Sequence, residues 1–133
     1  MQRKTNAHGR PALAMDALQT VSLGTARHWI RVRGTSTSNP PLLLMQLGPG
    51  LPIVNEARRF ERLLALENAF TVVYWDQRGT GLSLRDVSNR SNVNVAHMVA
   101  DTVSMLERLR DRFGAAPVVA GFSFGATFTA YAA

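Results

Sequence analysis

The sequence predicts an α/β fold built on a mostly parallel sheet with helices on both faces. Two observations carry this prediction. Uninterrupted apolar runs of strand length, at residues 42–45 and 71–75, are typical of strands that are covered on both faces. These runs alternate along the chain with segments whose apolar residues recur at helical spacing. With right-handed crossovers, the resulting order β, β, α, β, α, β, α gives a sheet of this kind.

The first predicted strand spans residues 26–34. Its apolar residues Trp29, Ile30 and Val32 alternate loosely with arginines, and a glycine ends the run. This pattern is typical of a half-exposed strand, and we expect an antiparallel strand at the edge of the sheet. Residues 35–41 are rich in Ser, Thr, Asn and Pro and are predicted to form a loop.

Residues 1–25 are interpreted as a flexible leader that precedes a core domain at 26–133. The start is basic and polar, and Pro11 and Asp16 interrupt the following stretch before an apolar region of signal length develops. No run approaches the roughly 18 apolar residues of a membrane span. We therefore expect a cytoplasmic protein with no membrane partner.

The middle of the chain is predicted to form a strand, a helix and a second strand. The apolar run at 42–45 ends in a Gly-Pro-Gly turn, beyond which Asn55 is a candidate helix cap. The helix is expected to end near Ala69. The β-branched and aromatic residues at 71–75 then form a buried strand that Asp76 closes.

The last part of the chain is predicted to form a long helix, a short strand and a further helix. One apolar stripe runs through residues 95–113, and Gly114 is the natural stop of that helix. Residues 117–120 form a short buried strand. Residues 121–125 turn into the small-residue helix at 126–133.

The formal charge of +6 comes almost entirely from arginine. The arginine clusters alternate with acidic residues on the polar sides of predicted helices and have no interleaved aromatic residues for base stacking. We interpret them as solvated helix faces and expect no nucleic-acid partner. The clusters are Arg58, Arg59 and Arg62, and Arg108, Arg110 and Arg112. The chain has no cysteine, which excludes disulfides, a thiolate nucleophile and cysteine-based zinc sites and is compatible with the cytosol.

The chemical motif is Gly-Phe-Ser-Phe-Gly at residues 121–125, between a predicted buried strand and a predicted helix. A serine on such a sharp turn has an exposed hydroxyl, and the flanking glycines are needed because side chains there would collide with neighbouring elements. Ser123 is the candidate nucleophile. The backbone N–H of Phe124, at the positive end of the helix, is a candidate donor to an oxyanion.

Two further segments resemble a known family. Residues 43–50, LLMQLGPG, resemble the strand and loop of prolyl aminopeptidases and related α/β-hydrolases, which usually read as a leucine-rich strand followed by His-Gly-Gly-Pro-Gly. Residues 74–83, YWDQRGTGLS, are similar to that family's Asp-Gln-Arg-Gly-x-Gly-x-Ser signature. The chain is thus identified as resembling the N-terminal half of an α/β-hydrolase fold.

The resemblance implies a serine hydrolase, most similar to a prolyl aminopeptidase, which cleaves an N-terminal residue by acyl-enzyme chemistry at Ser123. It implies that the backbone N–H of Gly48 is the second oxyanion donor beside Phe124. Gln46 and Leu47 replace the family's His and Gly, so we expect an altered oxyanion loop in which Leu47 narrows the site.

The resemblance also implies structural roles around the elbow. Asp76 and Arg78 are expected to form an ion pair or hydrogen-bond network that fixes the loop beneath the nucleophile. The supporting glycines are Gly50, Gly79, Gly81, Gly121 and Gly125. No cofactor and no metal are implied, and the expected partner is a small-molecule or short-peptide substrate.

In this fold the triad acid and histidine follow the serine in sequence. His8, His28 and His97 all precede Ser123, and we interpret each as a surface or boundary residue. The chain is therefore expected to be a fragment without a complete triad or the family's helical cap, inactive or nearly so in isolation. Its last strand is expected to form an open, apolar edge that favours association.

Other functions are compatible with the same residues. An esterase, lactonase or acyltransferase uses the same elbow, because a fold does not fix its substrate. Epoxide hydrolases and haloalkane dehalogenases resemble the Asp-x-Arg-Gly region but have aspartate at the position of Ser123. A degenerate, non-catalytic hydrolase fragment or binding module is a further alternative.

Overall fold

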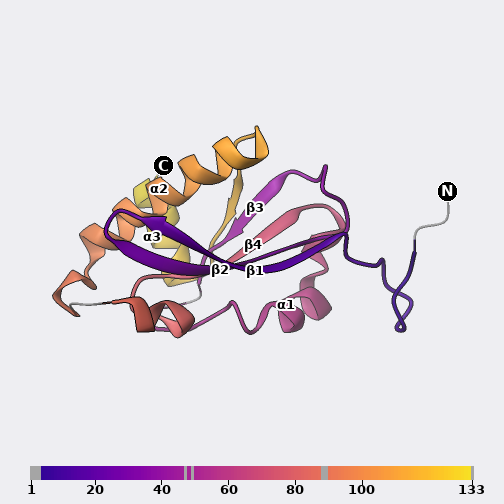
Figure 1. Cartoon of the computed structure of the whole chain (residues 1–133), viewed down its shortest axis with the longest axis horizontal. Coiled ribbons are helices and arrows are strands. Elements are labelled where there is room, and N and C mark those ends of the chain that lie inside the picture. The colour runs from indigo at the N-terminus through magenta and orange to yellow at the C-terminus, as the bar shows by residue number, and fades with distance from the viewer. Residues whose placement is uncertain (1–3, 47, 49, 88–89, 133) are drawn as a thin grey trace.

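The computed structural model describes residues 4–46, 48, 50–87 and 90–132 (Figure 1). Its strands form a sheet in the order β1-β2-β4-β3-β5. The strands are β1 (Met15–Leu23), β2 (Ala26–Gly34), β3 (Pro41–Leu44), β4 (Thr71–Asp76) and β5 (Val118–Ala120), and the α-helices are α1 (Ala57–Leu64), α2 (Val95–Phe113) and α3 (Phe124–Ala132). Three short 3-10 helices add η1 (Leu66–Asn68), η2 (Gly81–Asp86) and η3 (Arg90–Asn92).

The sheet is mostly parallel, as predicted. Strand β3 pairs in parallel with both β4 and β5, whereas β2 pairs antiparallel with β4 and with β1. Only β2 therefore runs against the other described strands. Helices α2 and α3 cover one face of the sheet and α1 covers the other (Figure 1).

Both faces of β3 and β4 are buried, which explains their uninterrupted apolar sequences. In β3, Leu43 faces the core beneath α2 and α3, while Leu42 and Leu44 face the core beneath α1. Strand β4 alternates in the same way, with Trp75 on the first side and Tyr74 on the second. Because side chains alternate across a strand, burial of both faces favours apolar residues at consecutive positions, as at residues 42–44 and 72–75.

The leader predicted over residues 1–25 is wrong where β1 forms. Met15–Leu23 pairs with β2 along its whole length, and Met15 and Val21 pack against the core. Side chains of β1 alternate between half-buried and exposed, as in a strand with one face on the core. Polar residues occur on both of its faces, so this alternation is hard to recognise in the sequence. Strand β2 is antiparallel as predicted, but β1 covers it, so the prediction that β2 is an edge strand is also wrong.

Helix α1 differs from its prediction at both ends. It begins at Ala57 with no side-chain cap, so Asn55 is not its cap. It ends where Ala65 takes a left-handed conformation at φ 50°, and η1 follows. Helix α2 matches its prediction, and at its end the backbone N–H of Gly114, where φ is 67°, donates to the Arg110 oxygen.

Strand β5 lies at the end of the described sheet, as predicted, and Val118 in it is 47% exposed. The association expected from this apolar edge remains a prediction. Within the described residues, no helix is both long and apolar enough to cross a membrane.

Candidate active site

Ser123 lies on a sharp turn between β5 and α3. Its φ is +53°, in the left-handed region that side chains other than glycine rarely adopt. The side chain is exposed, and α3 begins at the next residue, Phe124. The elbow predicted from the sequence therefore forms, with strained backbone directly at the candidate nucleophile.

The two glycines of the motif are required by close packing. A Cβ on Gly121 would lie 2.7 Å from the backbone carbonyl carbon of Gly125. A Cβ on Gly125 would lie 2.5 Å from the backbone oxygen of Gln46 and 2.9 Å from the Cβ of Met45. Each contact is shorter than real side chains show, so both positions exclude any other residue unless the backbone moves.

The same contacts bring the end of β3 against the elbow, where the oxyanion loop was expected. The Met45 amide donates to the Ala120 oxygen over 2.9 Å, and Gly48 beyond it is buried. The oxyanion roles of Gly48 and of the Phe124 amide remain predictions. Leu47, expected to narrow the site, lies outside the described residues.

Gln46 is the unusual residue of this loop. Its side chain is fully buried, and neither amide atom has a hydrogen-bond partner. Gln77, at the end of the neighbouring strand β4, is in the same state. Buried polar atoms without partners are uncommon in proteins, so these two side-chain amides stand out near the carboxyl ends of β3 and β4.

Asp76 holds two loops together at the end of β4. Its Oδ1 accepts from the amides of Ile53 (2.8 Å) and Val54 (3.0 Å), and its Oδ2 accepts from the amide of Leu82 (3.0 Å). The Ser83 hydroxyl also donates to the Asp76 backbone oxygen over 2.5 Å. The predicted hydrogen-bond network is therefore present, with backbone amides rather than Arg78 as the partners of this carboxylate.

Glycines make room for this carboxylate. A Cβ on Gly81 would collide with Asp76 Oδ2 and lie 2.6 Å from the Cβ of Pro52, and φ there is +51°. Gly79 has φ +73°, and a Cβ on it would meet Val93 at 2.9 Å. Gly50 has φ +76° but open space around it, so backbone conformation alone favours glycine there.

Arg78 pairs with a residue that the sequence analysis did not single out. Its Nε and Nη2 donate to the two carboxylate oxygens of Asp101 on α2, each over 2.8 Å. Both side chains are only 4% exposed. The hydrogen bonds to Asp101 raise the pKa of Arg78, so the guanidinium in this fork-shaped pair stays charged. It joins the loop after β4 to α2.

His28 is a core residue, and its interpretation as a surface or boundary residue is wrong. The side chain is fully buried, its Nδ1 accepts from Trp75 Nε1 over 3.2 Å, and its Nε2 lies 3.4 Å from Asp101 Oδ2. The alternation of β2 directs it inward, between Trp75 and α2. Burial lowers the pKa of His28, and the positive charge of Arg78 lowers it further. The negative charge of Asp101 acts in the opposite direction but is outweighed. The imidazole is therefore neutral at pH 7 and enclosed away from Ser123.

A neutral buried histidine predicts a loss of stability in acid. Because the pKa of His28 is lower in the folded state than its ordinary 6.5, the unfolded chain binds more protons as the pH falls below about 6.5. We expect the His28→Gln variant to remove this contribution, which amounts to at most about 1.4 kcal/mol per pH unit. Urea midpoints measured between pH 7.5 and 5 test this. His97→Gln, at an exposed position on α2, should leave the pH slope unchanged, and equal slopes in wild type and His28→Gln would contradict the prediction.

The other histidines are exposed, as expected: His8 lies near the start of the chain, and His97 on α2 contacts Asn94. Asp101 could have been found from the sequence, because it sits at helical spacing among the buried residues Met98 and Met105 of α2. A carboxylate on an apolar stripe needs a buried partner. Within the described residues, no group of three or more metal-ligating side chains gathers.

The comparisons with known proteins agree on one fold. No protein-family model matches the chain. The probable aminopeptidase YbaC of Bacillus subtilis (strain 168) is 32% identical over 109 residues, which are 81% of this chain and 34% of that protein. A proline iminopeptidase-related protein from Thermus thermophilus superposes with a TM-score of 0.69 at 24% identity, over 89% of this chain and 40% of its own. An epoxide hydrolase from Vigna radiata superposes with a TM-score of 0.65 at 21% identity, over 88% of this chain and 35% of its own.

Proposed function

The chain has the α/β-hydrolase fold, and from this premise we propose that the protein is a serine hydrolase that attacks a carbonyl carbon through Ser123. The observation that carries the proposal is the elbow itself. An exposed serine with φ +53° follows a strand and begins a helix, between two glycines whose positions have no space for a Cβ. Such a turn presents a hydroxyl to a substrate.

Transition-state stabilisation is assigned to two backbone amides. Phe124 is the first residue of α3, so its N–H lies among those at the helix N-terminus that have no carbonyl partner within the helix. Gly48 lies in the loop that the packing of Gly125 on Gln46 brings to the elbow. Together they would donate to the oxyanion that forms when Ser123 attacks. The acid and the base of the triad are not assigned to any of the 133 residues.

The preferred substrate is a short peptide with a free amino terminus, cleaved after its first residue. The aminopeptidase description of the Bacillus subtilis relative, at 32% identity, favours this choice. The segment YWDQRGTGLS also favours it, because it resembles the Asp-Gln-Arg-Gly-x-Gly-x-Ser signature of prolyl aminopeptidases. The chain spans 34% of the curated relative, so this activity is proposed for the whole protein.

A fluorophosphonate probe tests the nucleophile. We expect the protein, expressed from its full coding sequence, to be labelled covalently, and the Ser123→Ala variant to lose labelling and arylamide hydrolysis by a factor of about 10⁴ or more. Ser104→Ala, on the half-buried side of α2, is the matched control and should keep both. Labelling that persists in Ser123→Ala would contradict the assignment.

The same assay separates the alternatives. Hydrolysis of p-nitrophenyl esters without any hydrolysis of proline arylamide would replace the peptidase by an esterase. An unlabelled, folded wild-type protein would favour the non-catalytic alternative. The likeness to an epoxide hydrolase, at 21% identity, concerns the fold alone, and the residue at the elbow is Ser123 rather than the aspartate that such enzymes use.

A further inference from the structure

A hollow of about 510 Å³, here called the arginine hollow, lies at the end of the sheet opposite Ser123. Asp16 near the start of β1 and Arg33 near the end of β2 line it. Because β1 runs in the same direction as β5 and β2 runs against both, these residues mark the amino ends of the parallel strands. Ser123 instead follows the carboxyl end of β5.

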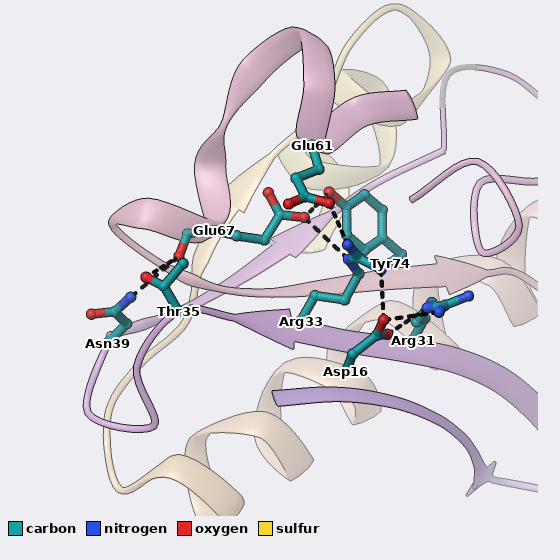
Figure 2. Close-up of polar contacts among 8 residues, drawn as sticks. All are labelled: Asp16, Arg31, Arg33, Thr35, Asn39, Glu61, Glu67 and Tyr74. Atoms are coloured by element: carbon teal, nitrogen blue, oxygen red, sulfur yellow. Dashed lines mark hydrogen bonds and ion pairs between the residues drawn. The ribbon is translucent and has the colours of Figure 1, made fainter. Parts of the chain in front are cut away.

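The charged side chains at the base of the arginine hollow are paired with one another. Arg33, almost fully buried, donates from Nη1 to Asp16 over 2.8 Å and from Nη2 to Glu61 (Figure 2). Arg31 donates to both oxygens of Asp16, over 2.7 and 3.0 Å. Partial burial acts to raise the pKa of Asp16. The hydrogen bond from Arg31 and the charge of Arg33 outweigh burial and hold this pKa below its usual value. The Asp16 carboxylate is therefore ionised, and both carboxylates are already occupied by arginines.

The rim is not satisfied. Arg10, Arg58 and Arg62 line the same hollow, and none of their guanidinium groups forms a hydrogen bond or ion pair with any described residue. With Arg33, the lining holds four arginines against Asp16 and Glu61, a formal charge of 4 − 2 = +2 with His8 neutral. Arg58 and Arg62 lie one turn apart on α1, where like charges repel. An anion between these guanidinium groups would relieve that repulsion.

An ordered turn presents the third arginine. The Asn6 side chain accepts from the amides of His8 (3.0 Å) and Arg10 (3.1 Å), and Ala14 donates to the Gly34 oxygen over 2.9 Å to tie the segment to β2. Residues predicted to be a leader thus build one wall of the arginine hollow. Arg10 on this wall therefore lines the same hollow as Arg58 and Arg62 of α1.

We propose that the arginine hollow binds a small polyanion of the phosphate class, such as pyrophosphate or the phosphates of a phosphorylated small molecule. Guanidinium groups match phosphate oxygens in charge and in fork-shaped geometry. The volume is within the range of small-ligand sites. The described lining holds no Phe, Tyr or Trp, so the His8 ring is the one surface there on which a nucleobase could stack, which favours a small anion over a nucleic acid.

Calorimetric titration with inorganic pyrophosphate at low salt tests this proposal on the protein expressed from its full coding sequence. We expect saturable binding that the Arg58→Gln/Arg62→Gln variant weakens by about tenfold or more, since it removes two charged hydrogen-bond donors from the anion. The matched control is Arg108→Gln/Arg110→Gln, which removes the same charge from the exposed face of α2 and should change the affinity less than about twofold.

Each other outcome overturns the proposal. Wild type that does not bind pyrophosphate removes the site. Equal weakening by both double variants would show that overall charge alone attracts the anion. A single-stranded oligonucleotide that binds more tightly and displaces pyrophosphate would assign the hollow to nucleic acid. Ser123→Ala should bind as wild type does, so failure of the hydrolase proposal and failure of this one are distinguishable, and circular dichroism of each variant shows that it is folded.

Discussion

Replacing Arg78 by methionine is expected to lower the free energy of unfolding by about 3–5 kcal/mol, because it leaves a buried charge unpaired. Asp101, 4% exposed, would lose both hydrogen bonds from the guanidinium. The remaining neighbour, His28, is neutral, so it offers Asp101 no positive charge in place of the guanidinium at pH 7. Urea denaturation followed by circular dichroism measures the loss.

The double variant Arg78→Met/Asp101→Leu distinguishes an unpaired charge from lost packing. Replacing both members of a buried pair by apolar residues of similar volume is often nearly neutral, so we expect most of the stability to return. Arg27→Met is the control at an exposed pair, where Arg27 lies 2.6 Å from Asp86 but is 58% exposed, and solvent screening makes its effect much smaller. A single Arg78 variant as stable as wild type would show that this pair is not buried in solution.

The parts of the fold that could be predicted are those whose signal is local. Strand β3 and the middle of β4 are apolar without interruption because both faces are buried, and α2 has a stripe and a glycine stop. The elbow was predictable for a similar reason. Gly121 and Gly125 are fixed by contacts within a few residues and with one neighbouring strand, so the motif carries its own geometry.

The parts that were missed depend on partners far apart in sequence. Strand β1 exposes one face, so its polar residues resemble those of a leader until β2 is in place. The pairing of Arg78 with Asp101 requires the loop after β4 to meet the middle of α2. Position in the sequence alone made His28 look like a surface residue, whereas the packing of α2 on the sheet encloses it.

Glu67, on the side of the sheet that α1 covers, is a further buried residue that the sequence does not reveal. Glu67 in η1 is only 1% exposed and accepts from the Tyr74 hydroxyl over 2.6 Å (Figure 2). Burial raises the pKa of Glu67, and burial with the neighbouring carboxylate raises that of Tyr74 as well. A lone glutamate in a short turn gives no sign of this in the sequence, because the tyrosine that donates to it belongs to the next strand along the chain.

Replacing Asp76 by alanine is expected to lower the free energy of unfolding by about 3–5 kcal/mol. Three backbone amides from two loops, those of Ile53, Val54 and Leu82, would lose their acceptor, and each buried amide left unpaired costs about 1–3 kcal/mol. Urea denaturation measures the change. Asp111→Ala, at an exposed carboxylate on α2, is the control that should stay close to wild type.

The neighbouring glycine shows whether the carboxylate acts through this contact. Gly81→Ala should be strongly destabilising by itself, because its Cβ would collide with Asp76 Oδ2 and lie 2.6 Å from the Cβ of Pro52. In the double variant Asp76→Ala/Gly81→Ala the first collision disappears while the second and the positive φ remain. The free energy of unfolding lost in the double variant should therefore be smaller than the sum of the two single losses, by about 1 kcal/mol or more. Strict additivity would mean that the carboxylate does not occupy the space beside Gly81, and that the loops before α1 and after β4 are held together by other contacts.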